Sequence, residues 1–130
     1  LFTFLFNSLS TAHASFKSRT YTTPLENQLK QLHLEISNSL EQKHSIARCA
    51  KQLNISESYF QLIYKKLFGI SFQQDLILMR VTRARFNLST SNLSLSQIAE
   101  FCGYNNEVHF YRQFKKLTGV TPTQYRKHPF

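Results

Sequence analysis

The sequence predicts an all-α fold in which two helix-turn-helix subdomains are joined by a linker helix, with about seven helices in all. A basic segment occurs twice, as YKKLFGIS at residues 64–71 and, fifty positions later, as FKKLTGVT at residues 114–121. Upstream of these segments, residues 50–53 correspond to residues 99–102 at an offset of forty-nine. One residue has therefore been gained within the second copy, and a tolerated insertion marks a turn between two helices. No segment has the alternating pattern of a strand.

The signals for helix starts divide the chain into elements. Thr23 can cap a helix, Pro24 suits its first position, and Glu26 can complete a capping box. Apolar residues follow at helical spacing, namely Leu25, Leu29, Leu32, Ile36 and Leu40. Similar start signals, each with Gln three residues later, occur at Ser71, Ser94 and Thr121. The expected organisation is a first helix-turn-helix subdomain at 24–70, a linker helix at 71–90 and a second subdomain at 91–130.

Residues 1–23 are expected to be the end of an upstream domain followed by a flexible linker. The chain begins without Met, and its first apolar stretch of six residues is too short to span a membrane and lacks the basic flank of a signal peptide. These apolar positions fit both a short helix and a strand. Residues 10–23 are half Ser and Thr, which is typical of a linker.

Charge is concentrated in the duplicated part. The 130 residues include 16 Lys and Arg against 7 Asp and Glu, which gives a net charge of +9 and a pI near 9.8. Residues 46–130 hold twelve basic and four acidic side chains, a net of +8. This placement indicates contact with a polyanion such as nucleic acid, and a solubilising basic surface is the alternative. With 42% hydrophobic residues, the chain can bury a core.

Apolar periodicity separates a buried from an exposed face on the second helix of the first copy. This helix is expected to run from Ser56 to about Phe68, with a buried stripe formed by Phe60, Ile63, Tyr64 and Leu67. The opposite face presents Ser58, Gln61, Leu62 and Lys65. An exposed leucine on a helix that enters a DNA groove can meet a thymine methyl group.

The second copy shows the same division. The residues expected to be buried are Phe110, Phe114 and Leu117, and those expected to face outward are Val108, His109, Arg112 and Lys115 or Lys116. The fifty-residue offset places Val108 on Ser58 and Arg112 on Leu62. The apolar periodicity within each copy and the offset between the copies therefore select the same exposed face.

The lysine pairs at the ends of these helices have two interpretations. Lys65, Lys66, Lys115 and Lys116 are predicted to contact DNA phosphates, because their identical placement in both copies exceeds what solubility requires. Alternatively, they only solvate the helix ends and complement the helix dipole.

The segment between the copies sets their separation. A helix from Ser71 to about Leu88 would be roughly 27 Å long at 1.5 Å per residue. Successive major-groove faces lie about 34 Å apart, so one chain is expected to place both reading helices in neighbouring grooves and to bind as a monomer. Because each copy is expected to have its own core, the helix is predicted to tolerate an insertion near Asn87.

No residue pattern indicates catalysis. Cys49 and Cys102 lie in corresponding helices without a CxxC motif, and they are predicted to be reduced packing residues. The five histidines are scattered, and neither a Gly-rich phosphate loop nor a nucleophile with a nearby base is found. We therefore expect no enzymatic activity, no metal and no cofactor.

Two long motifs resemble a known family. IAEFCGY at residues 98–104 and FYRQFKKLTGVTPTQYR at residues 110–126 are similar to the C-terminal signature of AraC/XylS-family transcriptional regulators. The spaced residues Arg80, Val81, Ala84 and Leu88 resemble the linker-helix pattern of that family. The resemblance covers residues 24–130. It implies two helix-turn-helix subdomains that bind successive major grooves of a promoter, with an upstream domain that senses a signal or dimerises.

The resemblance also implies roles for individual residues. The positions that would read bases are Ser58, Gln61 and Leu62 in the first copy and Val108, His109 and Arg112 in the second. Relatives often have Arg at position 62 and an aromatic or small residue at position 109, so their base preference does not transfer to this chain. Residues assigned to the fold rather than to contact are Gly103, Phe110, Phe114, Gly119, Pro122 and Tyr125.

The expected function is sequence-specific binding of double-stranded promoter DNA by a bacterial-type transcription regulator in the cytoplasm, at the nucleoid. Expected partners include RNA polymerase, together with an effector or dimer partner that binds a missing upstream domain; no membrane is expected. One alternative is the DNA-binding module of a recombinase or transposase, whose catalytic carboxylates would lie elsewhere. The other is a basic interaction module without sequence specificity.

Overall fold

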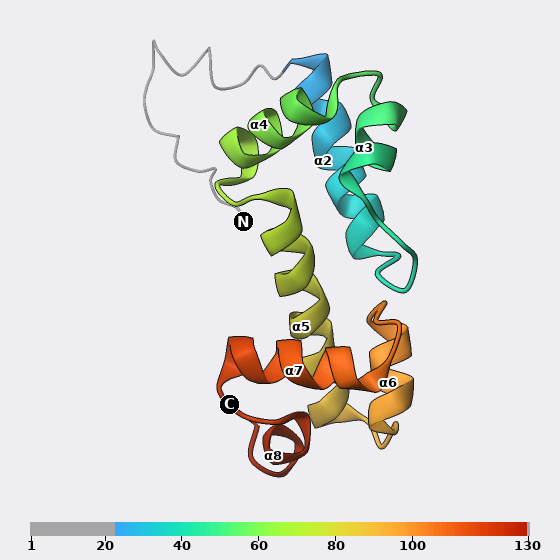
Figure 1. Ribbon diagram of the computed structural model, residues 1–130, viewed down its shortest axis with the longest axis vertical. Helices are drawn as coiled ribbons and strands as arrows, with labels where there is room; N and C mark the ends of the chain where they lie inside the picture. Colours follow the sequence, from blue (N-terminus) through green and yellow to red (C-terminus); the bar gives the residue numbers. More distant parts are fainter. Residues whose placement is uncertain (1–22, 130) are drawn as a thin grey trace.

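The computed structural model describes residues 23–129, which form seven α-helices and no strand (Figure 1). The helices are α2 (Pro24–Ser37), α3 (Ile46–Gln52), α4 (Glu57–Phe68), α5 (Phe72–Thr90), α6 (Leu95–Phe101), α7 (Glu107–Thr118) and α8 (Pro122–Lys127). The predicted all-α fold with two helix-turn-helix units is confirmed. The predicted upstream end and linker lie outside the described residues, except for Thr23.

Each predicted start signal begins a helix. The Thr23 hydroxyl accepts the Glu26 N–H at 3.0 Å, and the Glu26 carboxylate accepts the Thr23 N–H at 2.9 Å, which completes the capping box. The same reciprocal pairs form between Ser94 and Gln97 and between Thr121 and Gln124. These caps satisfy backbone donors that a helix start would otherwise leave unpaired.

The two turns differ by one residue, as the change of offset predicted. Residues 53–56 connect α3 to α4, and residues 102–106 connect α6 to α7. Both turns pass through the left-handed backbone region, at Asn54 with a φ of 58° and at Gly103 with a φ of 92°. Both are closed by a backbone hydrogen bond at the next residue, from Ile55 to Ala50 (3.0 Å) and from Tyr104 to Ala99 (2.9 Å).

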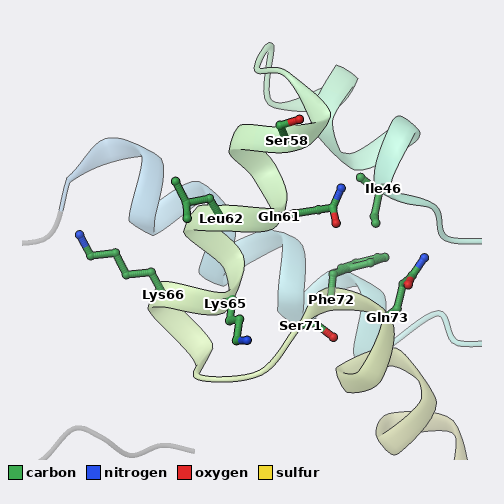
Figure 2. A pocket seen from close by; sticks show the side chains of 9 residues that line it. All are labelled: Ile46, Ser58, Gln61, Leu62, Lys65, Lys66, Ser71, Phe72 and Gln73. Atoms are coloured by element: carbon green, nitrogen blue, oxygen red, sulfur yellow. The ribbon is translucent and has the colours of Figure 1, made fainter.

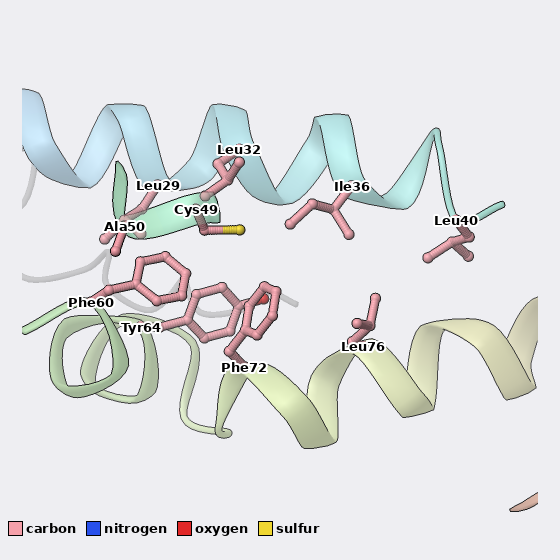
Figure 3. Packing of buried hydrophobic residues seen from close by; sticks show 10 residues of the cluster. All are labelled: Leu29, Leu32, Ile36, Leu40, Cys49, Ala50, Phe60, Tyr64, Phe72 and Leu76. Atoms are coloured by element: carbon pink, nitrogen blue, oxygen red, sulfur yellow. The ribbon is translucent and has the colours of Figure 1, made fainter. Parts of the chain in front are cut away.

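Two separate clusters of buried side chains form the cores, and α5 belongs to both. The first core is built from α2, α3, α4 and the start of α5, with Phe60 and Tyr64 fully buried at its centre (Figure 3). The second is built from α6, α7, α8 and the later part of α5, around Phe110 and Phe114. The residues that α5 supplies are Phe72 and Leu76 to the first core and Val81, Ala84 and Leu88 to the second.

This division corrects the expectation that an insertion near Asn87 would be tolerated. Leu88 is buried in the second core, and its carbonyl accepts a hydrogen bond from Arg126 Nε at 3.2 Å. An insertion at residue 87 would therefore displace Leu88 from the core that Val81 and Ala84 also enter. The helix passes from one core to the other between Leu76 and Val81.

Leu117 is a second correction. It was expected to be buried with Phe110 and Phe114, but 44% of its side chain is exposed. Leu117 lies in the last turn of α7 and is not among the side chains that pack against the second core. Helical spacing gives the direction of a side chain but not how far the core extends along the helix.

Both cysteines are free thiols within the cores, in agreement with the predicted packing role. Burial raises the pKa of Cys49 and of Cys102 to about 11, so both remain protonated at neutral pH. Across residues 23–129, no helix combines the length and apolar character needed to cross a bilayer.

Candidate nucleic-acid interface

The buried face of α4 fixes which side chains point outward. Phe60 and Tyr64 are fully buried, so the helix cannot rotate without removing them from the first core. Ser58, Gln61 and Leu62 consequently lie on the exposed side, and 65% of Leu62 is exposed. The Ser56 hydroxyl caps the helix by accepting the Tyr59 N–H at 3.1 Å.

The exposed side of α4 faces an open pocket of about 570 Å³ (Figure 2). All five predicted contact residues of the first copy line it, namely Ser58, Gln61, Leu62, Lys65 and Lys66. The remaining lining comes from the start of α3 and the start of α5, through Ile46, Ser71, Phe72 and Gln73. The structure thus brings the first predicted set together on one concave surface that also includes the capped start of α5.

The buried face of α7 has the same effect in the second subdomain. Phe110 and Phe114 are fully buried, and Val108, His109 and Arg112 are exposed. Asn106 caps the helix, with its Oδ1 accepting the His109 N–H at 2.8 Å. The ring of His109 meets the ring of Tyr104 edge to face, with centroids 5.4 Å apart.

The four predicted phosphate-contacting lysines occupy matching positions in the last turns of the two helices. Lys65 and Lys66 lie at the end of α4, and Lys115 and Lys116 at the end of α7. Each helix closes with a left-handed glycine, and the N–H of Gly69 or Gly119 donates at 2.8 Å to the carbonyl of Lys65 or Lys115. All four side chains are exposed, and none forms a salt bridge with a carboxylate of residues 23–129.

Two tyrosines on these faces were not selected from the sequence. Tyr59 on α4 is 45% exposed and Tyr111 on α7 is 39% exposed. The fifty-residue offset pairs Tyr59 with His109 and Tyr111 with Gln61, so extending the comparison to every exposed position would have found them. Their hydroxyl groups add hydrogen-bonding capacity to both faces.

A buried carboxylate attaches α4 to α5. The Tyr64 hydroxyl donates to Asp75 Oδ2 at 2.6 Å, and His33 Nε2 of α2 lies 3.2 Å from the same oxygen. The His33 ring also stacks on Phe68 at 4.7 Å. Burial raises the pKa of Asp75, but the hydrogen bonds with His33 and Tyr64 outweigh it and leave this pKa below its usual value. Asp75 therefore helps to set the position of the exposed face of α4.

Replacing this carboxylate should reveal a pH-dependent contribution to stability. Asp75→Asn is expected to lower the free energy of unfolding at pH 7 by about 1–2 kcal/mol, since it removes charge-assisted hydrogen bonds. A lowered pKa in the folded state adds stability above the unfolded pKa of about 3.9, and this gain disappears as the pH falls through the folded value. The difference between wild type and variant should therefore shrink below about pH 4.

Urea unfolding at pH 7 and at pH 3 measures this difference. Glu100→Gln is the matched control, because Glu100 is exposed and its replacement should change stability by no more than about 0.5 kcal/mol. A stability loss in Asp75→Asn that is the same at both pH values would show that the Asp75 charge is not the source.

No cluster of three or more His, Cys, Asp or Glu side chains with the geometry of a metal site occurs within the described chain. What the geometry provides instead is a pair of exposed helix faces, each held by buried aromatic residues and each ending in two lysines. Helix pairs α3–α4 and α6–α7, each joined by a short turn, define a domain with two helix-turn-helix units.

Comparison with known proteins agrees with this class. The family described as "Helix-turn-helix domain" matches residues 49–128. The arabinose operon regulatory protein of Escherichia coli is 27% identical over 104 residues, which are 79% of this chain and 36% of that protein. The C-terminal domain of the response regulator YesN from Fusobacterium nucleatum is 32% identical, with a TM-score of 0.73, and the match covers 77% of this chain and 98% of that domain.

A further similar structure is the DNA-binding domain of the global transcriptional factor AdpA, solved in complex with a target DNA. It is 26% identical with a TM-score of 0.74, and the match covers 77% of this chain and 90% of that domain. The chain belongs to the AraC/XylS family of helix-turn-helix transcriptional regulators. It spans about two fifths or less of the length of the curated relatives it matches.

Proposed function

We propose that residues 24–130 form a sequence-specific binding domain for double-stranded DNA that regulates transcription. The observation that carries this proposal is the repetition of one exposed face, which carries polar and apolar side chains and ends in two lysines, on the second helix of both units. In Figure 1, α4 and α7 lie near opposite ends of α5. With 19 residues, α5 is about 28 Å long, which is comparable with the 34 Å or so between successive major-groove faces.

The proposed base contacts differ between the two helices. Arg112 on α7 can pair with guanine through two hydrogen bonds, Gln61 on α4 can pair with adenine, and Leu62 can contact a thymine methyl group. Ser58, Val108 and His109 complete the proposed set. The proposed phosphate contacts, which position the helices without reading sequence, are Lys65, Lys66, Lys115 and Lys116.

The proposal extends to the protein that contains this domain. The AdpA domain, which has a similar structure, was crystallised with its target DNA, and this supports duplex DNA as the partner. Because the curated relatives are much longer, residues 1–23 are proposed to connect this domain to an upstream domain that binds an effector or a dimer partner. Promoter DNA and RNA polymerase are the proposed partners, at the nucleoid in the cytoplasm, with no catalytic step in this domain.

Footprinting and sedimentation test the two-groove arrangement. The 130-residue chain is expected to bind a selected duplex as a monomer and to protect nearly two helical turns, about 20 base pairs. Protection of only about 4–6 base pairs, the extent of a single groove contact, would contradict the proposal. Equal binding to selected and random duplexes would instead favour a basic module without sequence specificity.

Leu62→Arg tests whether α4 reaches the bases. The substitution adds a charge that is attracted to phosphate, so affinity for random duplexes should rise, and the favoured base at its position should shift away from thymine. Selection from a random duplex library measures both effects. Leu78→Arg is the matched control, because Leu78 is also an exposed leucine but lies on α5, outside both reading helices. An unchanged selected motif in Leu62→Arg would show that residue 62 does not contact bases.

A further inference from the structure

In addition to sharing α5, the two subdomains touch where the loop after α2 meets the turn between α6 and α7 (Figure 1). Leu40 lies in that loop and is buried in the first core, whereas Gly103 lies in the turn of the second subdomain. A Cβ atom at Gly103 would lie far closer than 3.0 Å to the carbonyl oxygen of Leu40, a separation that real Cβ atoms essentially never show. The backbones of the two subdomains are therefore in direct contact at Gly103.

The equivalent turn in the first subdomain shows why this position is glycine. Asn54 occupies it there, with a φ of 58°, so a side chain is compatible with the left-handed conformation of this turn. Gly103 has a similar conformation, with a φ of 92°, but its neighbours are Leu40 and the guanidinium of Arg80. The contact between subdomains, and not the turn alone, thus requires glycine at 103.

Two arginines of α5 strengthen the same contact. Arg83 Nη2 donates to the Ser37 carbonyl at the end of α2 at 2.9 Å, and Arg80 Nη2 donates to the Gln42 carbonyl at 3.4 Å. The Arg80 guanidinium also lies 5.9 Å from the centre of the Tyr104 ring. Its Nε is buried without a hydrogen-bond partner in the described part of the chain.

We infer that Leu40, Arg80, Arg83 and Gly103 form a brace that fixes the angle between the two subdomains. The brace thereby determines the spacing that the domain accepts between two DNA half-sites, one read by α4 and the other by α7. Helices bend gently along their length, and a bend in α5 would move α7 relative to α4. A second attachment away from the axis of α5 opposes that bend. The consequence for DNA rests on the proposed function, whereas the consequence for subdomain geometry does not.

The test compares Gly103→Ala with Gly119→Ala. Gly119 has a φ of 84°, close to that of Gly103, but a Cβ there would meet no atom within 4 Å. Both variants therefore introduce alanine at a positive φ, and only Gly103→Ala disturbs the contact between subdomains. Spin labels on cysteines introduced at the exposed positions Lys30 and Thr123 report the distance between subdomains without DNA. Titrations with the selected site and with each half-site report binding.

In Gly103→Ala, the distribution of distances between the two spin labels is expected to shift or broaden. Binding to the full site should weaken by about tenfold or more, because protein or DNA must bend to restore the fit. Half-site affinities should not change, and Gly119→Ala should keep the wild-type distance. If circular dichroism shows that Gly103→Ala is unfolded, Arg83→Ala weakens the same contact without adding an atom, and the same changes are expected of it.

Three outcomes would overturn the inference. The first is an unchanged label distance in a folded Gly103→Ala variant. The second is an unchanged label distance in Arg83→Ala, if that variant is used because Gly103→Ala is unfolded. The third is a loss of full-site binding in Gly119→Ala as large as that in Gly103→Ala. Failure of the wild-type chain to prefer any duplex sequence would refute the proposed function instead, and the label distances would still test the brace.

Discussion

Arg112→Ala is expected to weaken binding to the preferred site by about 1–3 kcal/mol and to relax selection at one base pair. Arg112 is exposed on α7, two residues after the fully buried Phe110 and two before Phe114, which hold it on the outward face. No carboxylate among residues 23–129 forms a salt bridge with its guanidinium. The planar guanidinium can therefore form two parallel hydrogen bonds with a guanine edge, and alanine removes both.

Lys116→Ala provides the comparison. Its removal is expected to weaken selected and random duplexes alike and to reduce the salt dependence of binding by about one phosphate contact. Titrations of both variants against a panel of single-base changes, at several salt concentrations, separate the two kinds of contact. If Arg112→Ala left the ranking of the duplexes unchanged, Arg112 would be a phosphate contact and not a base contact.

Local patterns in the sequence were sufficient to predict the helices and most of their exposed faces, with Leu117, Tyr59 and Tyr111 as the exceptions. Hydrogen bonds between residues three apart decide the caps at Thr23, Ser94 and Thr121, and both partners of each bond are visible in the sequence. Helical periodicity likewise predicts that Phe60 and Phe110 point inward. Because these two residues are equivalent in the internal repeat, the prediction for one supports the prediction for the other. The contacts that the exposed residues make with DNA remain predictions.

Features that depend on contacts between distant segments could not be predicted in this way. Asp75 lies on the buried face of α5, beside the apolar residues Phe72 and Leu76. Its partners His33 and Tyr64 come from α2 and α4. Gly103 was assigned to the fold, and the structure adds its contact with Leu40, sixty-three residues earlier in the chain. Neither relation leaves a periodic signal, because the partners lie far apart in the sequence and meet only in the folded structure.

The assignment of α5 to both cores also defines where the subdomain spacing can be changed. Phe72 and Leu76 belong to the first core, Met79 packs against it, and Val81 begins the set that enters the second. An insertion between Met79 and Arg80 therefore keeps all fully buried residues of α5 with their own cores. The partly buried Ile77, which packs against the second core, is the main side chain that it displaces.

Four alanines inserted between Met79 and Arg80 are expected to abolish specific binding while both subdomains stay folded. The insertion lengthens the helix by about 6 Å and rotates the second subdomain by roughly 40°, at 1.5 Å and 100° per residue. It also separates Arg80 and Arg83 from the carbonyls of Gln42 and Ser37. Bending DNA by tens of degrees to restore the fit costs on the order of 1–6 kcal/mol, which is enough to remove most of the specific affinity.

The insertion variant should thus remain helical by circular dichroism and bind the selected site no better than a random duplex. Charge-driven binding to any duplex should persist, because no basic residue has been removed. Leu78→Ala is the control, since it places alanine on the same segment, at an exposed position, without changing the length of α5. In the proposed two-groove arrangement, α4 and α7 reach successive grooves at one spacing only. Full-strength specific binding by a folded insertion variant would therefore mean that a single helix reads the DNA and that the other subdomain only packs beside it.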